Sequence, residues 1–130
     1  IDLAKYFINS KVTNYDIKVN KKNKDFQIYL EFSDYSTSTI NYFFSGSKGF
    51  PKEEIKIFCG GNVGLINNFK KVEVIGDKNF SKRSIFSQLK GHEESIKEFK
   101  KRLKDGNSDS NYLNDILETT EICLELSSEI

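Results

Sequence analysis

The chain has 130 residues, of which 37% are hydrophobic and 30% charged, a composition typical of one soluble globular domain with a core of its own. Its 20 Lys and Arg side chains nearly balance its 19 Asp and Glu side chains, and the formal net charge of +1 provides no whole-chain field to attract nucleic acid or an anionic membrane. Apolar runs reach only a few residues, far fewer than the roughly 20 that a transmembrane helix needs. We therefore expect a single domain, residues 1–130, with neither a nucleic acid nor a membrane as its partner.

The first residues already follow a helical pattern. Leu3, Tyr6 and Phe7 repeat at helical spacing, which predicts a helix over residues 2–9. A natural chain seldom starts inside a helix, and this one contains no methionine. We interpret the sequence as a domain excised from a longer protein.

Strands follow this helix. Residues 12–19 predict a polar strand, and residues 26–32 alternate strictly between apolar and polar side chains. A short polar link at residues 34–36 leads into a further alternating strand, which is typical of an antiparallel hairpin. The side chains expected to face the core are Phe26, Ile28, Leu30, Phe32, Ile40, Tyr42 and Phe44.

The second half predicts more strands and then two helices. Strand patterns occupy residues 55–59, 63–66 and 72–75, and one short edge strand is expected within 77–88. Ile96, Phe99 and Leu103 line one face of a helix over 91–105, and a final helix extends to about residue 128. Its apolar pattern comprises Leu113, Ile116, Leu117, Thr120, Cys123 and Leu124. The order predicts an α+β fold: a mostly antiparallel open sheet of about six strands, with helices packed on one face and the other face an interface.

The two cysteines, Cys59 and Cys123, fall in a predicted strand and a predicted helix. They could pair, but we interpret them as buried reduced thiols, because free cysteine packs as a small hydrophobic side chain. That interpretation favours a reducing, cytoplasmic location.

No nucleophile and base can be assembled from the sequence. His92 is the only histidine, which excludes a metal site with two histidines. It could act as a general acid or base or contact a substrate, although its position at the start of a predicted helix favours a capping or surface role. The glycines of residues 60–64 are followed by a strand pattern, so we interpret them as a hairpin turn and not as a phosphate-binding loop.

Two surfaces remain as candidate binding sites. Lys48, Phe50 and Lys52 lie around a loop shaped by glycine and proline, which either holds an anionic sugar or is a solvated hairpin tip. The central hairpin carries aromatic and polar side chains on the face opposite the core, which suggests a surface for another domain or a second subunit. These side chains are Tyr29, Glu31, Asn41 and Phe43.

Several of these segments resemble one protein family. The hairpin Phe26–Asp34 with Ser36 and Ile40–Tyr42 is similar to the paired strands and F-x-D-G-S turn in the C-terminal domain of the glucose–fructose oxidoreductase, inositol dehydrogenase and rhizopine-catabolism family (Gfo/Idh/MocA), with Tyr35 in place of the glycine. The resemblance covers nearly the whole chain and is closest to the branch often fused to a zinc-type alcohol dehydrogenase module. The other matching segments are Gly46–Glu53, Ile55, Phe58, Gly60-Gly61, Asn68-Phe69, Lys90–His92, Glu94 and Ile116–Thr120.

The resemblance implies the C-terminal half of an NAD(P)-dependent dehydrogenase that acts on a sugar or nucleotide sugar. The cofactor, NAD or NADP, would bind an N-terminal Rossmann domain, and the catalytic acid–base residue would lie upstream of Ile1. This chain alone would then bind no cofactor and be inactive, since the hydride chemistry belongs to the missing half. The sheet would mediate homo-oligomerisation. The residues carried over to the substrate side are Asn41, Lys48, Phe50, Lys52 and His92.

Two other function classes compete with this one. The first is a stand-alone binding or scaffold domain that shares the same sheet. The second is an RNA-binding sheet, which would need a basic stripe beside its aromatic rings, and the nearly neutral net charge argues against it.

Overall fold

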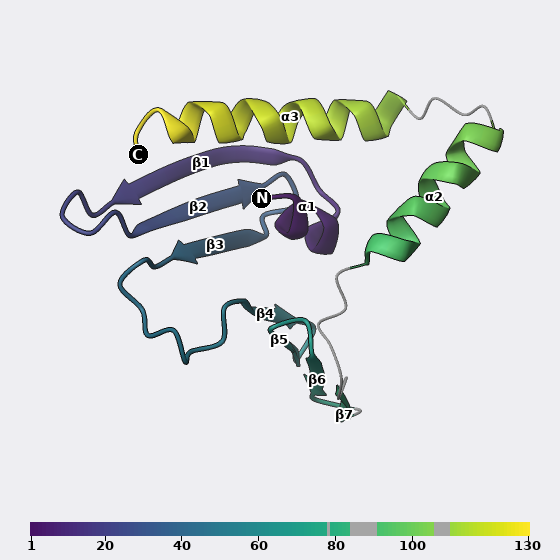
Figure 1. Ribbon diagram of the computed structural model, residues 1–130, viewed down its shortest axis with the longest axis horizontal. Helices are drawn as coiled ribbons and strands as arrows, with labels where there is room; N and C mark the ends of the chain where they lie inside the picture. Colours follow the sequence, from purple (N-terminus) through teal and green to yellow (C-terminus); the bar gives the residue numbers. More distant parts are fainter. Residues whose placement is uncertain (78, 84–90, 106–109) are drawn as a thin grey trace. The chain divides into compact units, whose positions relative to one another are not determined.

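The computed structural model of the chain describes residues 1–77, 79–83, 91–105 and 110–130 (Figure 1). The described residues form an α+β fold of three helices and seven strands, in close agreement with the elements expected from the sequence pattern. In chain order they are α1 (Asp2–Ile8), β1 (Val12–Val19), β2 (Phe26–Phe32), β3 (Thr37–Tyr42), β4 (Glu54–Cys59), β5 (Asn62–Asn67), β6 (Lys71–Ile75), β7 (Phe80–Arg83), α2 (His92–Asp105) and α3 (Ser110–Ser127). No helix in these ranges is long and apolar enough to cross a membrane.

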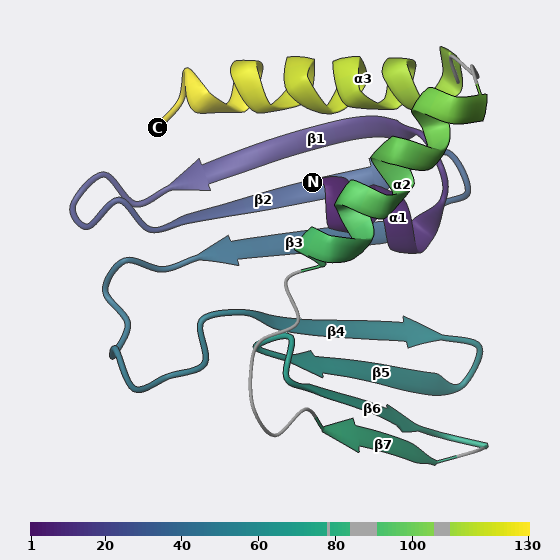
Figure 2. The ribbon, with the colours of Figure 1, turned by 45° about the vertical axis from the view of Figure 1, so that its right-hand side comes forward.

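The strands form two antiparallel sheets where the sequence predicted a single one of about six strands. The first sheet has the order β1-β2-β3 and the second the order β4-β5-β6-β7 (Figure 2). The segment between Tyr42 and Glu54 contains Pro51, which lacks a backbone donor, and is far longer than a hairpin turn, so it does not impose pairing between β3 and β4. The chain divides accordingly into two compact units: Ile1–Gly46 with α3, and the segment between them.

The turn between β2 and β3 explains how the first sheet keeps its register. Phe32 N–H donates to the Ser36 carbonyl at 3.0 Å, which leaves a three-residue loop whose last member, Tyr35, has a left-handed φ of 66°. This is the three-residue hairpin loop that ends in a left-handed residue. The Asp34 carboxylate accepts hydrogen bonds from the Ser36 N–H and hydroxyl, both at 3.0 Å, and so fixes the turn.

The hydrophobic core of the first unit lies between its sheet and α3. Leu30, at the centre of β2, is fully buried, and Ile28 and Phe32 beside it are also buried, as their alternation predicted. Helix α3 lies along this sheet (Figure 1). Its Ile122 and Leu126 complete the core cluster. Burial of each such side chain contributes about 1.5–3 kcal/mol.

The face of α3 that packs on the sheet differs from the apolar pattern of the sequence. The buried stripe is Thr119, Ile122 and Leu126, spaced by three and four residues. A helix in contact with one sheet buries only a narrow stripe, and the apolar side chains of α3 extend well beyond it. The apolar residues of α3 that stay exposed are Leu113, Ile116, Leu117 and Leu124.

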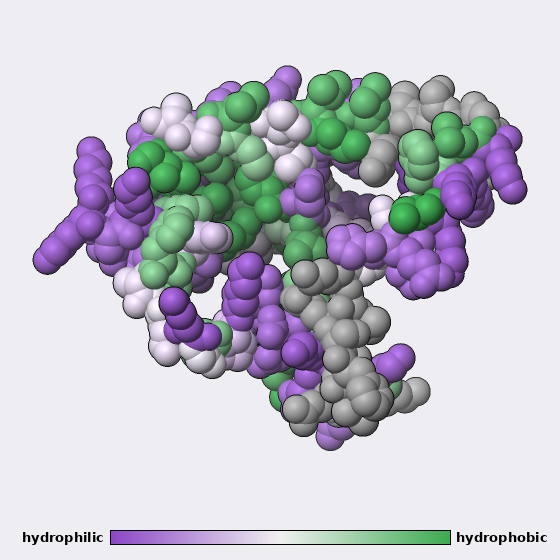
Figure 3. Space-filling view, in the orientation of Figure 1, coloured by the Kyte–Doolittle hydropathy of each residue, from purple (hydrophilic) through white to green (hydrophobic). Residues whose placement is uncertain are grey.

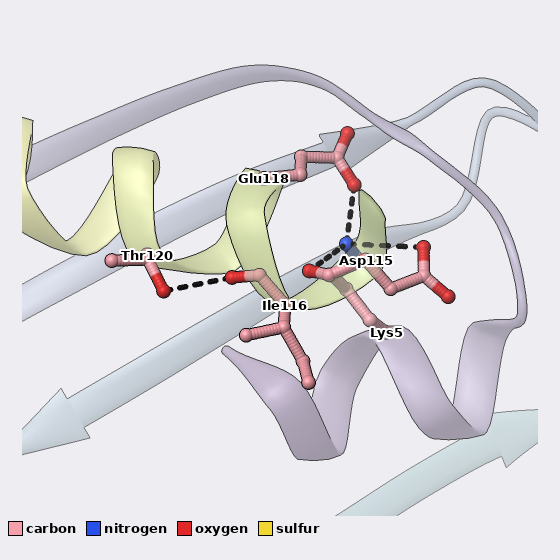
Figure 4. A network of polar contacts seen from close by, with 5 residues as sticks. All are labelled: Lys5, Asp115, Ile116, Glu118 and Thr120. Atoms are coloured by element: carbon pink, nitrogen blue, oxygen red, sulfur yellow. Dashed lines mark hydrogen bonds and ion pairs between the residues drawn. The ribbon is translucent and has the colours of Figure 1, made fainter. Parts of the chain in front are cut away.

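Helix α1 is joined to α3 by an ion-pair network around Lys5 (Figure 4). The Lys5 ammonium contacts the Glu118 carboxylate and the Asp115 carboxylate at 3.6 Å, and donates to the Asp115 carbonyl at 3.2 Å. The Lys5 side chain is only 9% exposed. A charge buried this far requires such partners, so the network fixes α1 against α3.

The second unit begins with a tight hairpin. Gly60 and Gly61 have φ of 54° and 78°, and Cys59 pairs with Asn62. A two-residue turn with positive φ at both positions matches the right-handed twist of the strands, and glycine adopts it without steric cost. The interpretation of these glycines as a hairpin turn is confirmed.

Burial differs from the sequence expectation at three further places. Tyr42 and Phe44 were expected to face the core but are 49% and 61% exposed, since they lie at and just after the end of the edge strand β3. Cys59 and Cys123 are unpaired, but both are exposed where buried thiols were predicted. Cys59 ends β4 next to the turn, and Cys123 lies one residue past the buried Ile122, outside the stripe of α3 that faces the sheet. In α2 the predicted apolar face is present and exposed. Its members are Ile96, Phe99 and Leu103.

Candidate functional site on the open sheet face

The face of the first sheet opposite its core gathers polar side chains from three strands. Period-two alternation directs Tyr29 and its neighbours on β2 away from α3. The antiparallel register places Asp16 of β1 and Thr39 of β3 on either side of Tyr29. It likewise places Lys18 and Asn41 on either side of Gln27, so side chains from three strands form one surface.

A shallow hollow of about 220 Å³ opens on this surface. It is lined by Asp16, Lys18, Gln27 and Tyr29, which supply a carboxylate, an ammonium group, an amide and a phenol. The Gln27 side-chain amide donates to the Asn41 side-chain oxygen at 2.7 Å, which orients both amides. Such a hollow can hold a polar group of a ligand or of another protein through several hydrogen bonds.

The interface candidates of the sequence analysis lie on or beside this open face. Tyr29 is 38% exposed, and Glu31 accepts a hydrogen bond from the Asn14 amide at 3.4 Å. Asn41 lies on the same face through its pairing with Gln27. Phe43 comes directly after β3 and is 66% exposed.

The remaining substrate-side candidates lie in the second unit. Lys48 and Phe50 sit in a turn in which Phe50 N–H donates to the Ser47 carbonyl at 3.0 Å, and Lys52 follows just before β4. All three are exposed, and neither lysine is ion paired with a residue that the structure describes. They form a solvated loop at the start of the second unit, while Asn41 belongs to the first.

His92 is the first residue of α2 and is exposed. The turn that starts this helix is closed by Ser95 N–H donating to the Gly91 carbonyl at 2.9 Å. Within the described residues the imidazole has no hydrogen-bond partner and no nucleophile to act upon. The surface role weighed for His92 agrees with this placement.

The chemistry of acid–base catalysis is not assembled in the described parts of the chain. Two groups have shifted pKa values, and both have structural causes. A hydrogen bond to the Glu125 carboxylate raises the pKa of Tyr15, and a hydrogen bond from the Ser45 hydroxyl, supported by backbone N–H groups of Phe44 and Ser45, lowers the pKa of Asp25. Neither group lies in a hollow next to a second reactive side chain, so neither has the environment of a catalytic residue.

Two features of the described residues concern a metal ion and a pyrophosphate group. No group of three or more His, Cys, Asp or Glu side chains in the described ranges could hold a metal ion. The glycines of residues 60–64 lead into β5 and not into a helix, so they offer no helix N-terminus to a pyrophosphate.

Sequence reasoning missed the carboxylate that organises one end of the first sheet. Asp25 accepts hydrogen bonds from Phe44 N–H and the Ser45 hydroxyl, both at 2.7 Å, and from the Asn23 amide at 2.7 Å. It thereby holds the segment after β3 against the turn between β1 and β2. An aspartate directly before a strand was the available signal, but nothing in the sequence pairs it with residues 19 and 20 positions later.

No family model matches the chain, and comparisons with curated proteins and with solved structures found no significant match.

Proposed function

We propose that this chain is the C-terminal substrate-binding and oligomerisation domain of an NAD(P)-dependent dehydrogenase that acts on a sugar or nucleotide sugar. The observation that carries the proposal is the open face of the first sheet. One face of that sheet packs on α3, while the other presents Tyr29 within a hollow lined by polar side chains. A surface of this kind suits a docking and binding domain whose chemistry is supplied elsewhere.

The resemblance noted in the sequence supports the same function. Tyr35 replaces the glycine of the resembling turn and has a left-handed φ of 66°, the conformation for which glycine is the usual residue. The turn therefore has a left-handed residue at this position without the glycine, and the resemblance itself rests on the sequence segments named above.

In this proposal the residues have separate roles. Lys48 and Lys52 attract the carboxylate or phosphate of an anionic sugar, and Phe50 provides an apolar wall. His92 is a further polar candidate for the substrate side in the second unit, and Asn41 is a polar candidate on the open face of the first unit. The acid–base residue and the NAD or NADP belong to an N-terminal Rossmann domain, and no step of the reaction is assigned to a side chain of this chain.

The open face is the proposed contact with a second copy. Tyr29 and Phe43 would supply aromatic contact area, and Glu31 a polar edge. Aromatic side chains among polar groups are enriched in protein interfaces, where they bury a large area at little entropic cost.

The decisive experiment measures dehydrogenase activity of the gene product that carries this chain. Reduction of NAD and NADP is followed by absorbance with a panel of neutral sugars, sugar acids and nucleotide sugars. We expect turnover with at least one of them. For an anionic substrate, Lys48→Ala/Lys52→Ala should raise KM about 100-fold or more, because the variant loses two charge-assisted contacts and each costs about 1.5–3 kcal/mol.

The matched control is Lys100→Ala/Lys101→Ala, which removes two exposed lysines of α2 and gives the same change in net charge. It should leave KM unchanged. Failure of the folded gene product to reduce either cofactor with any substrate of the panel would contradict the proposal and favour the stand-alone binding domain.

A further inference from the structure

One end of the first unit gathers positive charge. The turn between β1 and β2 and the end of β1 carry four lysines within residues 18–24, and all four are exposed. None of them forms an ion pair with any residue that the structure describes. Figure 3 shows hydrophilic side chains projecting at this end of the sheet. The four are Lys18, Lys21, Lys22 and Lys24.

The only acidic residue between positions 17 and 26 does not pair with these lysines. The Asp25 carboxylate is engaged by Asn23 and by two groups that follow β3, Phe44 N–H and the Ser45 hydroxyl. Its hydrogen bonds bring the segment of residues 43–45 beside the lysine-bearing turn. Residues 17–26 therefore carry a net charge of +3, from four lysines and one aspartate, and aromatic side chains are held next to them.

Three aromatic rings cluster at this point. The rings of Phe26 and Tyr42 stack, with their centroids 5.1 Å apart and an interplanar angle of 4°. The ring centroids of Tyr42 and Phe44 are 4.9 Å apart. The Phe44 side chain is 61% exposed and that of Phe43 is 66% exposed. Two phenylalanines thus stand in solvent beside four lysines. We call this surface the lysine–aromatic tip: Lys18, Lys21, Lys22, Lys24, Tyr42, Phe43 and Phe44.

We propose that the lysine–aromatic tip binds the surface of an anionic lipid bilayer. Lysines near such a surface are attracted by its negative potential. Their apolar methylene stems can lie against the apolar part of the membrane while the ammonium groups contact the headgroups. Phe43 and Phe44 would enter the interfacial region, where aromatic rings are favoured. Stable attachment requires two signals together, and the tip supplies a basic patch and an apolar contact.

The nearly neutral net charge of the chain does not oppose this local attraction. Helix α3 has no lysine or arginine and carries four acidic residues, so it balances the charge of the tip from another part of the unit. It packs on the core face of the sheet through Ile122 and Leu126. Charges farther apart than about 8 Å are largely screened at physiological salt. An anionic surface that contacts the tip therefore interacts mainly with the lysines of the tip.

The stacking geometry favours a membrane over single-stranded nucleic acid. Proteins that bind single strands offer ring faces on which bases stack, along a basic groove. Here Phe26 and Tyr42 cover one another's faces, and the lysines gather at one turn instead of following a groove. Nucleic acid is therefore an outcome of the test and not the expectation.

The test is co-sedimentation of the full chain with phosphatidylcholine vesicles that either contain or lack phosphatidylserine. We expect binding only to the anionic vesicles, with loss at high salt. Each lysine near an anionic surface strengthens binding about five-fold, so Lys21→Gln/Lys22→Gln/Lys24→Gln should weaken it about 100-fold. Phe43→Ala should weaken the binding that remains at intermediate salt.

The control triple Lys100→Gln/Lys101→Gln/Lys104→Gln removes the same charge from exposed positions of α2 and should bind as the wild type does. Circular dichroism establishes that each variant is folded. Equal weakening by both triples would reveal a net-charge effect and overturn the proposal. So would absence of vesicle binding, including the case in which the tip lysines instead bind an oligonucleotide. None of these outcomes depends on dehydrogenase activity, so this proposal and the proposed function fail separately.

Discussion

Tyr35 occupies a backbone conformation that suits glycine better than tyrosine. Its φ is 66°, and its side chain is 96% exposed, so it gains little packing to offset the strain. A left-handed residue with a Cβ costs roughly 1–2 kcal/mol, whereas glycine loses about 0.5–1 kcal/mol through its more flexible unfolded state. We expect Tyr35→Gly to stabilise the first unit by about 0.5–1 kcal/mol, measured by urea unfolding.

The matched variant for this turn is Tyr35→Ala, which keeps the Cβ and therefore the strain. Tyr35→Ala should produce no comparable increase in the stability of the first unit. A loss of stability in Tyr35→Gly would mean that the tyrosine ring contributes to the folded state, against the strain argument.

Asp25 gives the first unit a sensitivity to acid. Hydrogen bonding from Ser45, and then from the backbone at Phe44 and Ser45, lowers the pKa of Asp25 in the folded state below its ordinary value of 3.8. A depressed pKa stabilises the fold above the unfolded value, and this contribution is lost as pH falls through the folded value. We expect urea midpoints to fall between about pH 5 and pH 2, and less steeply in Asp25→Asn than in the wild type.

The control for this pH series is Asp16→Asn. The Asp16 carboxylate lines the open hollow and has no hydrogen-bond partner in the described parts of the chain. The Asp16→Asn variant should leave the dependence of the urea midpoint on pH unchanged. The same slope in all three proteins would show that the Asp25 hydrogen bonds do not distinguish the folded from the unfolded state.

At the scale of elements, the attachment of α1 to α3 depends on one buried cation. Lys5 reaches Glu118 and Asp115 from the opposite helix, and its side chain is 9% exposed while that of Glu118 is 30% exposed. Because the partners are partly solvated, Lys5→Met should destabilise the first unit by only about 1–2 kcal/mol, less than a fully buried pair would. Thermal unfolding measures this difference.

An exposed lysine of the same unit provides the comparison. Lys11→Met changes the same charge at an exposed position and should stay within about 0.5 kcal/mol of the wild type. If Lys5→Met were equally neutral, the ion-pair network would not hold α1 in place.

The elements themselves were predictable because their signals are local. Alternation in β2 identifies Leu30 as a core residue, and Gly60-Gly61 forms the hairpin turn that its sequence indicates. The buried face of α3 was not predictable, since Leu117 and Ile122 are equally apolar and only the position of the sheet decides which is covered. The exposure of Cys123 follows from the same choice.

The residues of the candidate site were also only partly predictable from the sequence. Tyr29 and Glu31 were placed on the open face correctly, because period two is a property of any strand. Asp16 and Lys18 were missed, since their presence beside Tyr29 and Gln27 depends on the register between β1 and β2. That register includes a bulge between Val12 and Asn14, and a single strand read alone gives no sign of it.

At the scale of the whole molecule, burial is distributed unequally. The buried side chains of the described residues all belong to the first unit, and none lies in β4–β7. One face of the second sheet is nevertheless lined by apolar residues from paired strands, namely Ile55, Ile57, Ile66, Val72, Val74 and Phe80. Of these six, Val72 is 39% exposed and Phe80 53% exposed, and the other four are half-buried.

Self-association of the whole molecule is a consequence of the proposed function, and light scattering over a range of protein concentrations measures it. The proposed function predicts a stable dimer or tetramer in which the open face around Tyr29 is buried. Replacing a central interface tyrosine costs about 2 kcal/mol or more, so Tyr29→Lys should weaken association about 30-fold or more. The matched variant Tyr35→Lys makes the same exchange in the exposed turn and should leave the mass unchanged. A wild-type monomer at every concentration would exclude the open face as a self-association surface and leave it for a different protein partner.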